Sequence, residues 1–225
     1  MSPLEGILVL TAGMAAGLIN TVVGSGTLVT FPTLLALGYP PVLANISNNI
    51  GLAPGSAAGA VGYRRELIGQ RRRLLTLASA SVLGGTIGAV LLLVLPGSAF
   101  EALVPALIAV ACVMVVVQPR VQAWVASRRT AGHRPHGSSA VWVLVGLTGV
   151  YGGYFGAAQG VLLVAILGIG LDERLQRVNA AKNVLATLVN AVAAVVFIVA
   201  ASLSYGQAAI SWPVAGLIAV GSVVG

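Results

Sequence analysis

The sequence contains 225 residues, of which 58% are hydrophobic and only 8% are charged. A mean hydropathy of +1.00 leaves too little polar surface to enclose a soluble core. We therefore expect an all-α integral membrane protein with a single transmembrane domain over residues 1–225. The net charge of +7 falls in short loops, where basic residues orient a membrane chain, so a nucleic-acid partner is not expected. Cys112 is the single cysteine and offers no internal disulfide, and no basic region precedes the first apolar run as a cleaved signal peptide would require.

The first predicted element, residues 4–37, is a membrane helix interrupted at Gly24-Ser25-Gly26-Thr27. After the break, the stretch 28–38 covers roughly 16 Å at 1.5 Å per residue, about half of a hydrocarbon core of about 30 Å. The segment is therefore predicted to enter and leave on the same face, with its tip near the midplane. Irregular backbone at that depth is tolerated only when it is buried in protein or lines a cavity.

The next three elements are predicted to be complete crossings at 42–63, 74–95 and 100–117. The first of them carries Asn45, Asn49 and Ser56, whose spacings of 4 and 11 residues place them on one helical face. The second carries Gly84, Gly85 and Gly88, which we assign to close helix packing. These elements complete a first repeat, residues 4–117, which a basic linker at 118–138 separates from the rest.

The second half, residues 139–225, begins with another interrupted segment, 139–169, whose glycine break lies at 156–160. A complete crossing is predicted at 178–203, and a further helix begins at Trp212. The crossing at 178–203 carries a second polar stripe of Asn179, Asn183 and Asn190.

The two halves resemble each other in sequence. GSGTLVTFPTLLALG (24–38) matches GAAQGVLLVAILGIG (156–170), and NISNN (45–49) matches NAAKN (179–183). LGGTIG (83–88) matches VGSVVG (220–225), so we expect the second repeat to be incomplete, lacking about one helix.

The loop charges predict that the repeats are inverted. All 12 Lys and Arg residues lie in three places: five in 64–73, four in 120–134, and Arg174, Arg177 and Lys182. The positive-inside rule places these regions in the cytoplasm and the uncharged connections 38–41, 96–101 and 204–211 outside. The basic loop 64–73 thus corresponds to the uncharged loop 204–211. Inverted-topology repeats with broken or re-entrant helices are a recurrent transporter design.

We predict that the two polar stripes and the two glycine breaks converge at the membrane centre, since Asn49 and Asn183 each reach roughly 10 Å into the bilayer from opposite sides. Uncharged amides, hydroxyls and free backbone N–H groups suit an oxyanion, which needs several donors. The alternative is that these amides only bond one helix to another. The candidate substrate-binding residues are Asn20, Gly24, Ser25, Gly26, Thr27, Asn45, Asn48, Asn49, Tyr154, Gly156, Gln159, Asn179, Lys182 and Asn183.

Two interpretations of Lys182 stay open: it attracts an anion within the membrane, or its side chain extends to the cytoplasmic interface. Glu66 is expected to pair with neighbouring arginines. His133 and His136 lie in the basic linker, where we expect a solvated loop rather than a metal site. Because no carboxylate is expected at midplane depth, we predict no catalytic residue, no metal site, no cofactor and no enzyme.

The broken first helix GLINTVVGSGTLVTFPTLLALGYPPVLANISNNIGLAPG, followed by a weaker copy after a basic loop, resembles the sulfite exporter TauE/SafE family of membrane permeases. The resemblance runs across nearly the whole chain and is strongest over 17–69 and 149–197. It implies transport of sulfur-containing oxyanions or organosulfonates, such as sulfite or sulfoacetate, across a bacterial inner membrane, and it does not fix the substrate. The second break, 156–160, departs from the pattern because it is less glycine-rich than the first.

The expected function is a permease that alternates access by rocking one half against the other, with a small anionic substrate and the lipid bilayer as partners. Export is favoured because a monoanion moving outward down an inside-negative potential gains about 2.3 kcal/mol per 100 mV. An importer of another small anion and a non-transporting membrane assembly factor are the alternatives. A homodimer is one of the oligomeric states left open.

Overall fold

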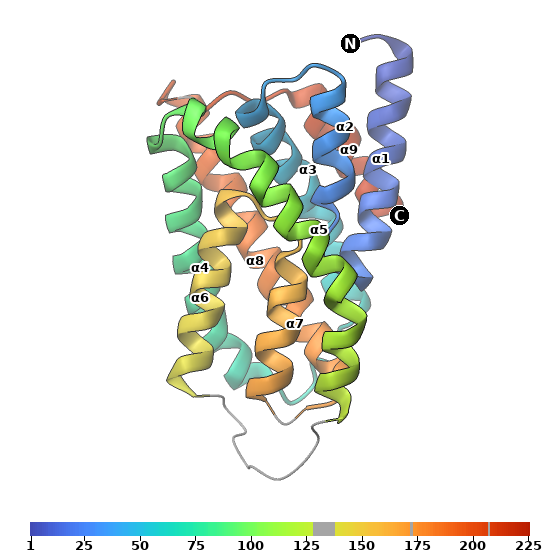
Figure 1. Cartoon of the computed structure of the whole chain (residues 1–225), viewed down its shortest axis with the longest axis vertical. Coiled ribbons are helices and arrows are strands. Elements are labelled where there is room, and N and C mark those ends of the chain that lie inside the picture. Colours follow the sequence, from blue (N-terminus) through green and yellow to red (C-terminus); the bar gives the residue numbers. More distant parts are fainter. Residues whose placement is uncertain (128–137, 172, 207) are drawn as a thin grey trace.

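The computed structural model describes residues 1–127, 138–171, 173–206 and 208–225, and every regular element within these ranges is an α-helix (Figure 1). In chain order the helices are α1 (Pro3–Val22), α2 (Thr27–Ala36), α3 (Pro41–Gly62), α4 (Arg71–Val94), α5 (Gly97–Ser127), α6 (Ser139–Tyr154), α7 (Gln159–Gly170), α8 (Leu175–Ser202) and α9 (Trp212–Val224). The all-α class expected from the composition is confirmed.

Four helices are long and apolar enough to cross a membrane by length and composition: α1, α4, α8, and α5 as far as Trp124. The amide-rich helix α3 has 22 residues, and α2, α6, α7 and α9 are shorter apolar helices. The predicted crossings at 42–63, 74–95 and 178–203 coincide with α3, α4 and α8. Helix α5 continues to Ser127, so the first part of the predicted linker is helical.

The distribution of polar side chains is reversed from that of a soluble protein. Large aliphatic residues such as Leu18, Val116 and Leu147 are exposed, which is typical of helices that face lipid. Asn48 and Lys182, in contrast, are buried within the bundle. These two polar groups of the membrane helices therefore lie on the inside, where they can contact other polar groups or a ligand.

Two pairs of helices are separated by short breaks, as the glycine clusters predicted. Helix α1 ends at Val22 and α2 begins at Thr27, with Gly24 between them at φ +83°. Helix α6 ends at Tyr154 and α7 begins five residues further on, at Gln159, with Gly156 between them at φ +82°. Glycine adopts this left-handed conformation without the steric penalty that a Cβ imposes.

The two breaks also end their helices in the same way. Ile19 O accepts hydrogen bonds from the N–H groups of Val23 and Gly24, and Tyr151 O accepts from those of Phe155 and Gly156. Figure 1 shows the α1–α2 pair opening toward one end of the bundle and the α6–α7 pair opening toward the other end. The depth of the breaks in a bilayer and the relation of the halves as inverted repeats stay predictions.

Glycine allows α4 to pack directly on α6. A Cβ at Gly84 would lie 2.1 Å from Gly146 O, and one at Gly88 would lie 2.1 Å from Val150 O. Gly85 faces α8, where a Cβ would lie 3.2 Å from the nearest backbone atom. The packing role predicted for these glycines of α4 is confirmed, and it holds the α4–α6–α8 layer together.

Candidate functional site at the two helix breaks

The two helix breaks lie in backbone contact with each other. Gly160 N donates a hydrogen bond to Gly24 O at 3.1 Å. A Cβ at Gly24 would lie 2.4 Å from Gly160 Cα, and one at Gly160 would lie 2.5 Å from Gly24 Cα. The approach is closer than any residue with a side chain would allow. Two segments far apart in the sequence are thus joined at a seam made only of glycine backbone, which we call the glycine seam (Gly24 and Gly160).

The first break begins α2 with several backbone donors unused. Within the described residues, the N–H groups of Ser25, Gly26 and Thr27 make no backbone hydrogen bond, whereas Leu28 N already bonds Ser25 O. Ser25 and Thr27 are buried. Free N–H groups at a helix N-terminus carry partial positive charge and form a natural anion site.

Asn48, in α3, holds the first break against that helix and has no free amide group to offer a ligand. Its Nδ2 donates to Thr27 Oγ1 at 3.3 Å, and its Oδ1 accepts from Thr30 Oγ1. Both of its polar atoms therefore have partners. Thr30 was not among the predicted site residues, although its position three residues after Thr27 on one helical face could have identified it.

The second break is surrounded by buried polar atoms that have no partner within the described residues: Asn45 Oδ1, Tyr154 Oη and Gln159 Nε2. Asn45 is anchored through its other atom, because its Nδ2 donates to Tyr154 O at 2.9 Å. Gln159 is 3% exposed and packs against Gly152, where a Cβ would lie 2.3 Å from its Oε1. Since most buried polar groups are paired in proteins, this cluster is available to a ligand.

An aromatic group closes the other side of the same break. Phe155 contacts Phe31 edge-to-face at 5.2 Å between ring centroids, and Phe100 contacts Tyr154 at 5.5 Å. These rings come from α2, α5, the end of α6 and the α6–α7 break. They belong to the hydrophobic core beside the polar cluster.

Lys182 lies at the end of α1 and is fully buried. Its Nζ donates to Thr21 O at 3.1 Å, and Asn183 Nδ2 reaches the same oxygen at 3.5 Å, the limit for a hydrogen bond. The side chain therefore does not extend to the cytoplasmic interface, and that interpretation is wrong. A cation at a helix C-terminus is stabilised by the partial negative charge of the last carbonyls. No sequence signal pointed to Thr21, because its contribution is a backbone oxygen.

The outer part of the polar stripes bonds helices to one another. Ser56 Oγ accepts from Asn20 Nδ2 at 2.8 Å and from Asn190 Nδ2 at 3.0 Å, which ties α1, α3 and α8 together. In this structure Asn20 is therefore a structural contact. Asn49 Oδ1 and Asn179 Oδ1, also in the polar stripes, are buried without a partner in the described part of the chain.

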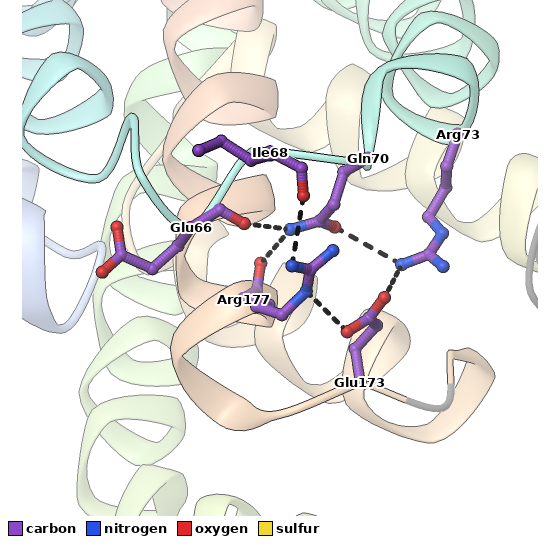
Figure 2. Close-up of polar contacts among 6 residues, drawn as sticks. All are labelled: Glu66, Ile68, Gln70, Arg73, Glu173 and Arg177. Atoms are coloured by element: carbon purple, nitrogen blue, oxygen red, sulfur yellow. Dashed lines mark hydrogen bonds and ion pairs between the residues drawn. The ribbon is translucent and has the colours of Figure 1, made fainter.

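Ionisable groups that could bind a metal do not cluster in the part of the chain that the structure describes, where no three His, Cys, Asp or Glu side chains gather. His133 and His136 lie outside the described residues. The expected pairing of Glu66 with neighbouring arginines is wrong. Within the described residues the ion pairs of Arg73 and Arg177 go to Glu173, and Figure 2 shows the Glu66 side chain pointing away from both.

Proteins similar to this chain carry transporter names. A Sinorhizobium protein named probable membrane transporter protein ORF9 is 30% identical over 97 residues, which cover 43% of this chain and 37% of the relative. The probable membrane transporter protein YfcA of Escherichia coli strain K12 is 26% identical over 193 residues, 82% of this chain and 69% of the relative. A probable membrane transporter protein of Haemophilus influenzae is 24% identical over 170 residues, 72% of this chain and 63% of the relative. The matched part of the chain therefore spans between 37% and 69% of these relatives.

No solved structure matches the chain. The sequence profile of the sulfite exporter TauE/SafE family matches residues 9–225, a region that contains both helix breaks and both polar stripes. Four helices with the length and composition of membrane spans agree with that match and indicate a multi-pass membrane protein. The chain belongs to the sulfite exporter TauE/SafE family of membrane transporters.

Proposed function

We propose that this protein is a bacterial inner-membrane permease that exports a small sulfur-containing oxyanion or organosulfonate by alternating access. The observation that carries the proposal is the glycine seam, because it brings two broken helices and their unused polar groups to one place. Membership of the family supports transport as the activity. The donors at the breaks support an oxyanion as the substrate, and its sulfur-containing class is what the resemblance to the family implies.

The donors suit an anion with several oxygens. The unused N–H groups of Ser25, Gly26 and Thr27 would bind it at the start of α2, and Gln159 Nε2 would bind it from the start of α7. Hydrogen bonds to a charged group contribute about 1.5 to 3 kcal/mol each, so a few such donors hold a desolvated oxyanion. Lys182 supplies positive charge nearby without closing the site by a direct ion pair.

Access would alternate through motion of one half relative to the other. The α1–α2 pair opens toward one end of the bundle and the α6–α7 pair opens toward the opposite end (Figure 1). Such an arrangement favours inverted repeats that rock around a central site. The glycine seam, which has no interlocking side chains, would be the axis at which the two halves slide or part.

Export is the direction that the membrane potential favours. With basic loops in the cytoplasm, an outward-moving monoanion gains about 2.3 kcal/mol per 100 mV, which sustains roughly a fiftyfold gradient. The cell would need no coupling ion to expel such an anion. An importer of a different small anion would need an additional driving force.

A second candidate, a non-transporting membrane assembly factor, is favoured by the Ser56 contacts with Asn20 and Asn190, in which the amides serve only to join helices. The two candidates differ in whether an anion binds. Thermal unfolding of the purified protein with increasing sulfite should show a saturable rise in melting temperature for a permease. An assembly factor shows no shift beyond that caused by chloride at equal ionic strength.

The decisive measurement is sulfite flux in reconstituted vesicles of determined orientation. We expect outward movement in the sense of the intact cell, at a rate that rises when an inside-negative potential is imposed. Flux in the inward sense against that potential, or none at all with folded protein, would overturn the proposal. Gly24→Ala, whose Cβ would lie 2.4 Å from Gly160 Cα, should lose this flux. Gly38→Ala is the matched control, because it has the same φ of +83° but its added Cβ meets no atom within 4 Å.

A further inference from the structure

Away from the glycine seam, one carboxylate bridges two arginines that come from different halves of the chain (Figure 2). Glu173 lies in the connection between α7 and α8. Its Oε1 is 3.0 Å from Nη1 of Arg73 in α4, and its Oε2 is 2.7 Å from Nε of Arg177 in α8. The Arg177 contact is a close ion pair rather than an aligned hydrogen bond. The side chains of Glu173 and Arg73 are only 18% and 10% exposed, so this contact is sheltered from water.

The two arginines are held in place by groups other than Glu173. Gln70 Oε1 accepts from Arg73 Nη1 at 3.3 Å, while Gln70 Nε2 donates to Arg177 O at 3.3 Å. Arg177 Nη1 also donates to Ile68 O at 3.2 Å. Each guanidinium therefore has at least one hydrogen-bond partner besides the carboxylate, Gln70 for Arg73 and Ile68 O for Arg177. We call Gln70, Arg73, Glu173 and Arg177 the arginine–glutamate cluster.

The geometry around Glu173 is that of an occupied oxyanion site. Each carboxylate oxygen contacts a different guanidinium. Guanidinium groups bind carboxylates and other oxyanions in the same way, through contacts with two of the anion's oxygens. A sulfite or sulfonate group offers two oxygens at a similar separation. Glu173 thus takes the place that such an anion would take between the arginines.

The cluster also lies where a cytoplasmic anion would arrive. Figure 1 places the α7–α8 connection at the end of the bundle opposite the N-terminus, together with the connection between α3 and α4. The α3–α4 connection and the first turn of α4 contain five of the twelve basic residues, in 64–73. The positive-inside rule assigns this end to the cytoplasm. For an exporter, it is the end from which the substrate enters.

We infer that Arg73 and Arg177 form a second oxyanion site at the cytoplasmic entrance, which Glu173 occupies as an internal substitute ligand until a sulfur oxyanion displaces it. This inference rests on the proposed function for the identity of the anion. Because Glu173 joins α4 to the α7–α8 connection, its displacement also removes a tie between the two halves. The arriving substrate would therefore loosen the cytoplasmic side as it binds.

Sulfite titration of the purified full-length protein tests this site. Glu173→Gln removes the competing charge while keeping the side-chain size, and we expect it to bind sulfite roughly 10-fold more tightly at this site, since the lost competitor made charge-assisted contacts. The control is Glu66→Gln, which removes the same charge from the neighbouring connection without touching the arginines (Figure 2). Equal affinity in the two variants would overturn the inference and leave the ion pairs as a structural tie.

Two further variants keep the test decisive. If Glu173→Gln does not fold, Glu173→Asp keeps the charge but withdraws the carboxylate, and tighter sulfite binding than in the unmodified protein is expected, whereas unchanged binding contradicts the inference. Repeating the titration with Gln159→Met, which weakens the central site, separates the two proposals. A response to Glu173→Gln without any sulfite flux would refute the permease and retain the entrance site. Normal sulfite flux without tighter binding in Glu173→Gln would refute the entrance site and retain the permease.

Discussion

Replacing Gln159 shows whether its side chain binds a ligand or serves packing, because the two roles predict opposite changes in the stability of the protein. Its Nε2 is buried without a partner in the described part of the chain, so the amide destabilises the empty protein. We expect Gln159→Met to weaken sulfite binding by roughly 10- to 150-fold, since a donor to a charged ligand is worth about 1.5 to 3 kcal/mol. Methionine is unbranched and similar in length, so we expect it to occupy the space that Gln159 fills beside Gly152.

The melting temperature of Gln159→Met should stay the same or rise, because the unpaired amide is removed. Calorimetric titration with sulfite and thermal unfolding of the same preparation measure both quantities. A variant that binds sulfite normally and unfolds earlier would show that Gln159 serves packing, and the central site would have to be placed elsewhere.

For a substitution at Ser56 we expect the opposite pair of effects, namely lower stability and unchanged sulfite binding. The Ser56 hydroxyl accepts from both Asn20 and Asn190, so Ser56→Ala leaves two half-buried amides with one partner fewer. We expect the free energy of unfolding to fall by about 1 to 3 kcal/mol, with sulfite affinity unchanged. Chemical denaturation in detergent, followed by titration of the folded protein, checks both. Weaker sulfite binding at unchanged stability would show that Asn20 belongs to the substrate site and is not only a structural contact.

At the scale of elements, the glycine seam predicts that contact between the two helix breaks is needed for stability and transport. Alanine variants at two glycines can test this contact separately from backbone strain. Gly24 and Gly38 share φ +83°, so alanine at either position suffers the same left-handed strain of about 1 to 2 kcal/mol. Only at Gly24 would the added Cβ also overlap Gly160 Cα, at 2.4 Å. We expect Gly24→Ala to be less stable than Gly38→Ala by a further 1 to 3 kcal/mol or so, and to lose sulfite flux.

Flux in vesicles and thermal unfolding of Gly24→Ala and Gly38→Ala provide the comparison. Since both variants carry the same backbone strain, the difference between them reports the contact alone. Equal stability and equal flux would mean that the two helix breaks are separated in the working protein, contrary to the glycine seam.

The elements differ in how much of them could be predicted from the sequence. Both helix breaks follow from local glycine clusters, and the stripe residues Asn45 and Asn183 could be placed near them by helical spacing. The contact of Gly24 with Gly160 could not, because it depends on how two distant segments pack. Nor could the partner of Lys182, a backbone carbonyl. Glu66 was expected to pair with arginines adjacent to it in sequence, but the fold brings Glu173 to Arg73 from the other half.

At the scale of the whole molecule, the orientation in the membrane can be tested by labelling. In a Cys112→Ser background, a single cysteine at Ser138 should be protected from an impermeant thiol reagent outside intact cells, and one at Ser204 should react. The reason is the confinement of basic residues to the connections near Ser138, the α3–α4 loop and the start of α8. Reaction at Ser138 with protection at Ser204 would reverse the topology.

The contact between Lys182 and the end of α1 has a consequence for how the transport cycle responds to voltage. In alternating access, the potential falls across whichever side of the carrier is closed, so a charge held at the centre experiences a different potential in each state. In the proposed carrier, a monoanion bound near the ammonium of Lys182 would make the loaded carrier electrically neutral there. The empty carrier would keep the positive charge, and an inside-negative potential would then accelerate its return to the inward-open state. Voltage would thus drive the reset of the carrier rather than the passage of its cargo.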